Sequence, residues 1–416
     1  MKICFFVWEF LPRLVGGLGT YAVEITKKFV ELGNEVTVFT LNDGNLPTFE
    51  KWNGIEIHRP LIVDSSYVFP VFVREDLKRW GKNIKFFSDI FSYNYLSAAK
   101  FINLLIRKMG IKFDVVAYHD WLSAFSGMII QKNLPGMPTV FHIHSIEEQR
   151  SLGGGSETVK EIERLAAKHS RKIITVSYSM KDFLIGLGYP KDKISVVYNG
   201  CDVEKYNPKN VNWELVEKLR ERYEIKENEK VIFYIGRLTF IKGIYNLVKA
   251  FSLVLREFPN TKLIMLGKGE SFTDLLVLAQ HLGLIKNKKV VIRSEWVSEE
   301  ERIAHYALAD LCVFPSISEP FGIVSLEAMS MEKPVVVGAK GVSGLREQVI
   351  PSGSERTGVH VNGEDPNDIA WGIKVILENF EEAKKWGKNG RKRVLKSFTI
   401  DRCAKETLRI YKEVSS

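Results

Sequence analysis

The sequence predicts an α/β protein built from two doubly wound domains in tandem. Three observations support this prediction: short β-rich runs alternate with amphipathic stretches of helical period, the alternation begins again near residue 200, and the chain has 416 residues. Alternating strands and helices are typical of parallel sheets with crossover helices. A chain of this length exceeds one ordinary core and fits two domains of about 200 residues each.

The first half is expected to open with a βαβ unit, in which Gly33-Asn34 ends the helix. The expected elements are strands at residues 2–8, 35–41, 113–118, 139–143 and 172–176, and a first helix at 19–32, with further helices after the later strands. Residues 61–95 are rich in Phe, Tyr and Trp and lack a clean period. This segment is therefore expected to cover a surface or to line a cleft.

A second series of elements follows Asn199-Gly200-Cys201-Asp202. The expected strands are residues 231–235, 262–266, 290–292, 311–314 and 334–337, and the expected helices are 243–257, 272–282, 299–309 and 323–331. Because ligands of doubly wound sheets bind beyond the carboxyl ends of the strands, functional residues should follow strands directly.

Composition excludes several classes of protein. With 45% hydrophobic and 26% charged residues the chain is ordinary for a globular protein, and no apolar run reaches the roughly 18 residues of a membrane span. The four cysteines are scattered without a CxxC pair, which argues against a disulfide framework or a zinc site and fits a cytoplasmic location.

The net charge of +9 is compatible with phosphate-bearing ligands, nucleic acid or an anionic membrane. No recognised nucleic-acid module is present, so nucleic-acid binding is not expected. Much of the positive charge lies in residues 384–396. We interpret this run as a solvated helix face that also allows a weak peripheral membrane contact.

The segment at residues 319–327, Glu-Pro-Phe-Gly-Ile-Val-Ser-Leu-Glu, follows an expected strand and enters a helix. Amides around Phe321, Gly322 and Ile323 would point at a ligand, and the helix dipole would favour an anion. Glu319 and Glu327 are far enough apart to accept hydrogen bonds from hydroxyls of a sugar and a ribose. The alternative is that Glu319 only begins the helix and that Glu327 is solvated.

Arg237 and Lys242 also lie between a strand and a helix. Two fixed cations in such a loop can neutralise a diphosphate, and stabilising a departing diphosphate is electrostatic catalysis that requires no metal. The alternative is a pair of surface cations near a turn.

Glycines and histidines follow other strands. Gly16-Gly17 and Gly267-Lys268-Gly269 would either let backbone amides approach a ligand or make tight turns, and neither matches GxGxxG. His119 follows the strand at 113–118, while His142 and His144 end the next one. A histidine there would donate to a sugar hydroxyl or orient the reacting group, or it would serve as a structural hydrogen-bonding residue. No spacing resembles a zinc site.

Taken together, these residues resemble the retaining glycosyltransferases of the GT-B fold, a group that includes bacterial and archaeal glycogen synthases. The resemblance spans nearly the whole chain. It rests on Gly16-Gly17-Leu18, His119-Asp120-Trp121, Asn199-Gly200-Cys201-Asp202, Gly236-Arg237 with Lys242-Gly243, and residues 319–327. The glycogen synthase pattern Lys-x-Gly-Gly-Leu is here Leu14-Val15-Gly16-Gly17-Leu18, so one expected cation is missing.

The resemblance implies two Rossmann-like domains facing across a cleft: residues 1–200 for the acceptor, 201–398 for the nucleotide sugar, and a helix at 399–416 that crosses back to the first domain. It implies catalytic roles for His119, Arg237, Lys242 and Glu319. The implied donor-binding residues are Gly16, Gly17, Gly236, Arg237, Lys242, Gly269, Trp296, Val297, Glu319, Phe321, Gly322, Ile323 and Glu327. It implies no metal and no cofactor, since the nucleotide sugar is a substrate.

The implied reaction is transfer of glucose, with retention of configuration, from UDP- or ADP-glucose to a growing α-1,4-glucan. The aromatic residues between Tyr67 and Tyr95 would then supply stacking surfaces for sugar rings. The alternative is transfer from a UDP- or GDP-sugar to a lipid, an inositol phosphate or a small sugar. A third class, an inert binding module or a sugar-nucleotide epimerase of the same fold, would not ordinarily combine Arg237, Lys242 and both glutamates.

Overall fold

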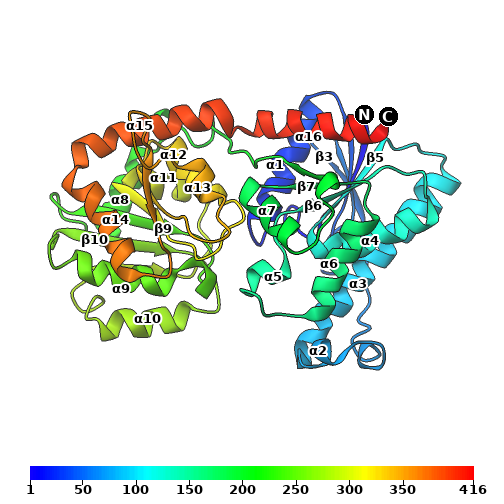
Figure 1. Cartoon of the computed structure of the whole chain (residues 1–416), viewed down its shortest axis with the longest axis horizontal. Coiled ribbons are helices and arrows are strands. Elements are labelled where there is room, and N and C mark those ends of the chain that lie inside the picture. The colour runs from blue at the N-terminus through cyan, green and yellow to red at the C-terminus, as the bar shows by residue number, and fades with distance from the viewer. The chain divides into compact units, whose positions relative to one another are not determined.

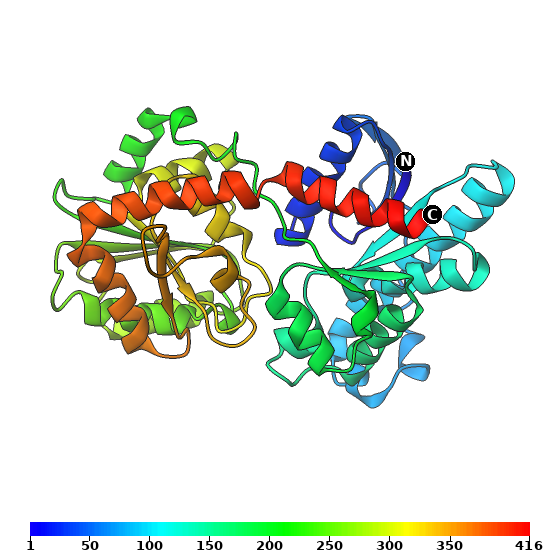
Figure 2. The ribbon, with the colours of Figure 1, turned by 45° about the horizontal axis from the view of Figure 1, so that its top comes forward.

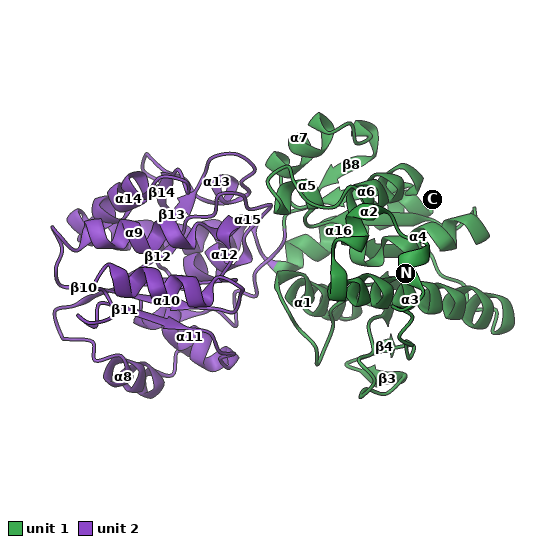
Figure 3. Ribbon diagram, turned by 90° about the horizontal axis from the view of Figure 1, so that it is seen from below, with its two compact units in different colours: residues 1–198, 400–416 green, residues 199–399 purple.

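The computed structural model describes residues 1–416 and divides the chain into two compact units, coloured separately in Figure 3. Unit 1 contains residues 1–198 and 400–416, and unit 2 contains residues 199–399. The sequence placed the divisions after residues 200 and 398. Each unit is a largely parallel sheet flanked by helices (Figure 1), which confirms two Rossmann-like α/β domains.

Unit 1 holds an eight-stranded sheet in the order β3-β4-β2-β1-β5-β6-β7-β8. Neighbouring strands are parallel except β3 and β4. The strands are β1 Lys2–Phe6, β2 Glu35–Phe39, β3 Phe49–Trp52, β4 Ile55–His58, β5 Val115–His119, β6 Thr139–Ile143, β7 Lys172–Thr175 and β8 Ile194–Val196. The chain leaves β1 toward β2 on one side and later adds β5 on the other, so the strand order reverses between β1 and β5.

The α-helices of unit 1 are α1 Gly17–Glu31, α2 Glu75–Lys78, α3 Ile84–Ala99, α4 Asp120–Asn133, α5 Glu147–Arg150, α6 Glu157–His169, α7 Tyr178–Gly186 and α16 Ile400–Ser415. A π-helical stretch, Lys100–Lys108, continues α3, and 3-10 turns lie at Phe69–Val71, Gly81–Asn83 and Lys191–Lys193. The aromatic segment at residues 61–95 thus forms short turns, α2 and most of α3.

The hairpin of β3 and β4 was not expected from the sequence. Its turn is Asn53-Gly54, and both residues have positive φ, 46° and 79°. Asn-Gly is the preferred pair for such a turn, so this signal was present and was missed. The hairpin extends the sheet through the pairing of β4 with β2.

Unit 2 holds a six-stranded parallel sheet in the order β11-β10-β9-β12-β13-β14. The strands are β9 Lys230–Ile235, β10 Thr261–Leu266, β11 Val290–Arg293, β12 Leu311–Phe314, β13 Val335–Gly338 and β14 Gly358–Val361. The helices are α8 Trp213–Arg222, α9 Ile244–Val254, α10 Phe272–His281, α11 Glu299–Leu308, α12 Ile323–Ser330, α13 Leu345–Gln348, α14 Pro366–Glu378 and α15 Phe380–Ser397, with 3-10 turns at Pro208–Asn210 and Phe240–Lys242. Here the strand order reverses between β9 and β12.

The C-terminal helix α16 belongs to unit 1, where it runs beside α1 (Figure 2). Inside this contact the buried Tyr411 hydroxyl lies 2.8 Å from Nε2 of His142. Arg171 donates to the carbonyl of Val414 over 2.9 Å. These two hydrogen bonds hold α16 against β6 and against the residue before β7 of unit 1.

The basic run at residues 384–396 lies on α15 and is only partly a solvated face. Lys384 and Lys385 pair with glutamates one turn earlier, which is the expected arrangement. Arg391 instead donates to the carbonyl oxygens of Tyr206 and Ser330, and Arg393 to those of Glu347 and Gln348. Part of this charge therefore holds backbone within unit 2.

No helix of the structure is long and apolar enough to cross a membrane. All four cysteines are free and buried, with none paired in a disulfide.

Candidate functional site

The expected site residues of unit 2 lie where its strand order reverses. In doubly wound sheets the crevice at such a reversal, beyond the carboxyl ends of the strands, is the usual ligand site. Arg237 and Lys242 follow β9, and Glu319 follows β12, so these residues come from the two strands on either side of the reversal.

Lys242 and Glu319 are brought into direct contact. The Lys242 ammonium pairs with Oε2 of Glu319 across 77 residues of sequence, and the Ser316 hydroxyl donates to the same oxygen over 3.3 Å. The two side chains are only 18% and 12% exposed. A charge pair with this little solvent is strong enough to hold both groups in position at the strand ends.

Arg237 differs from Lys242 in being exposed and without an ion-pair partner. Its backbone is fixed, because the buried Tyr234 hydroxyl donates to its carbonyl oxygen over 2.9 Å. The guanidinium is therefore a cation on a rigid turn that remains available to an anionic ligand.

The turn that carries Lys242 approaches the end of β12 closely. Gly243 has a φ of 68°, and a Cβ there would lie 2.0 Å from the carbonyl oxygen of Pro315. Only glycine combines that conformation with that contact. Gly243 thereby allows the loop after β9 to reach the loop after β12.

The segment that follows Glu319 enters α12 as expected. Gly322 caps α12 with a φ of 91°, and the Gln348 side chain donates to the carbonyl of Phe321 over 2.8 Å. The side chain of Phe321 is buried, whereas Ile323 is half-buried at the first position of the helix. The free amides of a helix start lie here, beside Glu319.

Glu327 is buried, not solvated. Its Oε2 accepts from the Arg302 guanidinium and, over 2.7 Å, from the Tyr306 hydroxyl. Burial alone would lower the pKa of Arg302, but the Glu327 carboxylate raises it well above its usual range. Arg302 and Tyr306 were missed from the sequence, because their relation to Glu327 exists only once α11 packs beside α12.

The other donor residues expected in unit 2 lie on loops after the neighbouring strands. The Gly236 amide donates to Leu266, and Leu238 donates to the carbonyl of Lys268, which holds the loop containing Gly269 against the loop after β9. Trp296 and Val297 follow β11, and Trp296 is 67% exposed. An indole ring this exposed offers a flat face for stacking.

In unit 1 the Gly16-Gly17 loop lies at the corresponding reversal, after β1. Gly16 caps α1 and Gly17 begins it. The Glu9 carboxylate accepts from the amides of Val15 and Gly16 over 3.1 and 2.9 Å. A carboxylate thus occupies the start of α1, the position at which a helix favours an anion. Glu9 was not expected in this role.

His119, which was expected just after a strand at 113–118, is the last residue of β5, on the other side of this reversal, and is fully buried. Its Nδ1 lies 2.9 Å from the carbonyl oxygen of Phe6, which requires a proton on Nδ1. Burial, with His144 nearby, lowers the pKa of His119 well below its usual range, so Nε2 carries no proton. His119 was expected to donate to a sugar hydroxyl, to orient the reacting group or to serve as a structural hydrogen-bonding residue. In this tautomer Nε2 can only accept, and its burial requires neighbouring groups to move before a sugar reaches it.

Asp120 has a φ of 52°, which is uncommon for a residue other than glycine. Its Oδ1 accepts from the amides of His144 and Ser145 over 2.7 and 3.3 Å. Burial raises the pKa of Asp120 to about 6, although the Arg150 guanidinium opposes this shift. A left-handed, buried carboxylate at a strand end is a common feature of functional sites; Asp120 was noted only as part of the His119-Asp120-Trp121 motif, and no role was expected for its carboxylate.

A buried ionic network adjoins Asp120. The Arg150 guanidinium pairs with Glu147 and Glu163 over 3.1 Å each. Both oxygens of Glu163 also lie 3.0 Å from the amide of Glu147. Burial raises the pKa of Glu163 to about 8. The network anchors α5 to α6 at the edge of the sheet that carries His119.

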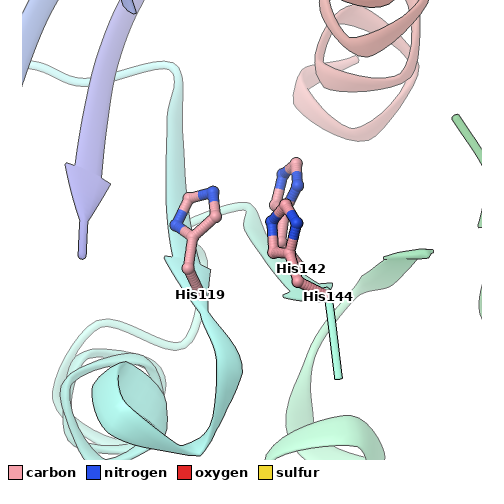
Figure 4. A group of neighbouring side chains, drawn as sticks. All are labelled: His119, His142 and His144. Atoms are coloured by element: carbon pink, nitrogen blue, oxygen red, sulfur yellow. The ribbon is translucent and has the colours of Figure 1, made fainter. Parts of the chain in front are cut away.

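His119, His142 and His144 lie together (Figure 4), although their spacing did not resemble a metal site. One ligand atom from each lies within 4.8 Å of the others. Their rings are stacked with interplanar angles of 15° to 28°, so their in-plane lone pairs do not converge on one point. Two of the rings already hydrogen-bond to Phe6 and Tyr411. In this packing the three residues form an aromatic stack and do not fit the tetrahedral geometry of a three-histidine zinc site.

Comparison with known proteins agrees with this arrangement. The model of the glycosyl transferases group 1 matches residues 216–393, and that of glycosyltransferase family 4 matches residues 15–205. An uncharacterized glycosyltransferase of Methanocaldococcus jannaschii is 32% identical over 99% of this chain and 98% of its own length. A glycogen synthase of Mycobacterium tuberculosis is 26% identical over 99% and 94%.

Among solved structures, sucrose-phosphate synthase from Thermosynechococcus elongatus superposes with a TM-score of 0.77 at 22% identity, covering 99% of this chain and 98% of that one. At this identity the likeness shows the fold alone. The family matches, the full-length relative and the two Rossmann-like units lead to one conclusion: the chain belongs to the glycosyltransferases of the GT-B fold.

Proposed function

We propose that the protein transfers glucose from UDP- or ADP-glucose to the end of an α-1,4-glucan, with retention of the anomeric configuration. The observation that carries the proposal is the contact between Lys242 and Glu319 at the reversal of the unit 2 sheet, with Arg237 unpaired on the same loop. A nucleotide sugar presents a diphosphate next to a ring of hydroxyls. A cation next to a carboxylate can bind these two parts of the ligand, the cation the diphosphate and the carboxylate the hydroxyls.

In this proposal the donor replaces the ion pair. The Lys242 ammonium and the Arg237 guanidinium bind the diphosphate, and the Glu319 carboxylate accepts hydrogen bonds from the sugar hydroxyls. The diphosphate replaces Glu319 as the partner of Lys242, and the sugar hydroxyls replace Lys242 as the partner of Glu319. Neither side chain is left buried and uncompensated, which would oppose binding.

The remaining donor contacts follow from the same placement. The helix start at Phe321–Ile323 supports the sugar or phosphate oxygens with its amides. Glu327, held by Arg302 and Tyr306, accepts from the ribose hydroxyls. Trp296 and Val297 contact the base, for which the exposed indole offers a stacking face.

The chemical step breaks the bond between the anomeric carbon and the phosphate oxygen. The acceptor hydroxyl attacks from the same face, forms the new glycosidic bond and gives its proton to the departing diphosphate. Arg237 and Lys242 stabilise the charge that develops on that leaving group. Retention of configuration follows from attack on the face that the diphosphate leaves.

The glucan acceptor is supported by the full-length similarity to a protein named glycogen synthase. A second candidate is a lipid-linked or small-sugar acceptor. It is favoured by one observation, the apolar groove of unit 1 that is described below.

A two-step experiment tests the proposal. Nucleotide sugars are first screened by thermal shift, and the best donor is then used in radiolabelled transfer to glycogen and maltooligosaccharides, with product anomers assigned by NMR. We expect incorporation into the glucan as the α-anomer. No incorporation from any nucleotide glucose would remove the glucan acceptor, a β-linked product would remove retention, and nucleotide release that ignores added acceptor would indicate an epimerase or a hydrolase.

A further inference from the structure

Unit 1 contains an apolar groove of about 670 Å³ beside α2 and α3. Its lining is mainly aliphatic and phenylalanine side chains, among them Val68, Phe69, Phe87, Phe91, Phe125 and Ile162. Six of the 18 lining residues carry polar side chains, but five of them already have partners within the protein: Arg74 pairs with Glu161, Ser65 bonds to Ser92, and Thr158 donates to Asp76.

One end of the groove, at Phe87, lies near the edge of the sheet at which β5 ends in His119. A helix that connects two parallel strands begins at the edge of the sheet where the strands have their carboxyl ends. The lining residues come from most of the length of α3, from the second turn of α4, from the first three turns of α6 and from the segment before α3. The ring of Trp121, the residue two places after His119, contacts Phe87 and Trp80, which continues the aromatic surface toward the strand ends.

The rim of the groove exposes large apolar side chains. Tyr67 is 95% exposed, and Val71 and Phe72 are each 80% exposed. All three lie in the turn that precedes α2 (Figure 1). Phe72 also lines the groove, and three large apolar side chains this exposed within six residues indicate a surface that another apolar body covers.

Several cations lie near this rim in the sequence, and two of them have no carboxylate partner. Lys78 and Lys85 are paired with Glu75 and Asp89. Arg79 and Lys82 are exposed and have no carboxylate partner. The neighbouring Asp76 is used internally, because it accepts from the Ser156 and Thr158 hydroxyls over 2.5 and 2.8 Å. The free charge beside the rim is therefore positive.

We propose that this surface docks on an anionic lipid bilayer, with Tyr67, Val71 and Phe72 inserted among the acyl chains, one lipid chain in the groove, and lipid phosphates on Arg79 and Lys82. Apolar insertion flanked by basic side chains is the arrangement by which proteins lie on membranes without crossing them. A glucan would require many available hydrogen-bonding groups in the groove, and nearly all of the polar side chains there are already bonded within the protein. The proposal goes beyond the proposed function, since donor binding in unit 2 does not depend on it.

The test is flotation of the full-length protein with vesicles of phosphatidylcholine that contain about one third phosphatidylglycerol. We expect flotation that decreases when Tyr67, Val71 and Phe72 are all replaced by Ser, by at least about tenfold in the partition coefficient. The double charge reversal Arg79→Glu with Lys82→Glu should weaken binding about fivefold or more per residue, and added salt should weaken it as well. The matched control replaces Trp213, Val277 and Trp371 by Ser; these are exposed apolar residues of unit 2, at 60%, 62% and 51% exposure, and their loss should not change flotation.

Nucleotide-induced thermal shift of each variant shows whether unit 2 is folded, and it separates this proposal from the donor assignment. The membrane proposal is overturned if the wild-type protein does not float, or if the rim variant floats as well as the wild type. It is also overturned if light scattering shows a dimer that only the rim variant loses, which would make the rim a contact between copies. Retardation by maltooligosaccharide that the rim variant alone loses, without vesicle binding, would identify the rim as a glucan surface instead.

Discussion

The reversal points of the two sheets handle charge in opposite ways. In unit 2 the strand ends present full charges of both signs, Lys242 with Glu319 and an unpaired Arg237. In unit 1 burial moves both titratable groups toward their neutral forms, because it lowers the pKa of His119 and raises that of Asp120 to about 6. The difference supports the proposal that unit 2 binds an ionic ligand such as a diphosphate and that unit 1 binds uncharged hydroxyl groups.

The largest effect is expected at the charged residues of unit 2. Lys242→Ala or Glu319→Ala should lower the transfer rate about 100-fold or more while the protein stays folded, because each removes a contact to the leaving group or the sugar. Lys374→Ala is the control, since Lys374 of α14 forms an ion pair with Glu257, in the turn after α9 and away from the strand ends. Near-normal turnover in both site variants would place the donor elsewhere.

The glycine loops offer a second contrast, measured by urea unfolding. Gly243→Ala should destabilise the protein by about 2 kcal/mol or more, because the residue has positive φ and its Cβ would collide with Pro315. Gly16→Ala should change stability by less than about 0.5 kcal/mol, since Gly16 has an extended φ of −159° and open space at its Cβ position. Equal losses at both positions would contradict the structural difference between the loops.

A third prediction concerns Asp120, the buried carboxyl group of unit 1. Between about pH 4 and pH 6 the folded protein keeps a proton on Asp120 that the unfolded chain has released. This residue therefore lowers the free energy of unfolding as pH rises, by about 1.4 kcal/mol per pH unit, and the decline ends above pH 6.

Asp120→Asn should remove that slope, and asparagine tolerates the left-handed backbone. Asp365→Asn is the control, because Asp365 caps α14 and asparagine caps equally well. Urea unfolding at pH values from 4 to 7 makes the comparison. An unchanged slope in Asp120→Asn would show that Asp120 titrates normally in the folded state.

The smallest effect is expected at the start of α1. Glu9→Gln removes the charge that faces the amides of Val15 and Gly16 and should cost about 1 kcal/mol or less in thermal or urea unfolding. Glu31→Gln, near the opposite end of the same helix, should cost less than Glu9→Gln, because its exposed ion pair with Lys28 is worth little and the dipole there disfavours a negative charge. A larger loss at Glu31 than at Glu9 would refute the electrostatic explanation.

Much of the fold could be predicted because each strand of the two sheets is a short β-rich run bounded by turn residues. The strand Thr139–Ile143 and the strand Leu311–Phe314 have the expected bounds, and most other expected elements are shifted by only one or two residues. The β3–β4 hairpin was missed because its strands are short and half-polar, although Asn53-Gly54 marked its turn.

The candidate site could be predicted only as a set of residue types after strands. Nothing local to Lys242 indicates that it contacts Glu319, which requires β9 and β12 to be neighbours. The environment of Glu327 likewise depends on α11, and the proton position on His119 depends on a carbonyl from β1, a strand 113 residues earlier. Pairings and protonation states of this kind come from packing and have no signature in the order of residues.

The helix α16 has a consequence for how the chain is made. Unit 2 is one uninterrupted stretch, whereas unit 1 needs its last 17 residues, 400–416, after all of unit 2 has been synthesised. Until those residues leave the ribosome, the surface of α1 that packs on α16 is uncovered, and His142 lacks its hydrogen-bond partner, the Tyr411 hydroxyl. The domain that emerges first is therefore completed last, and a truncation or bulky fusion at the C-terminus should act on the N-terminal domain.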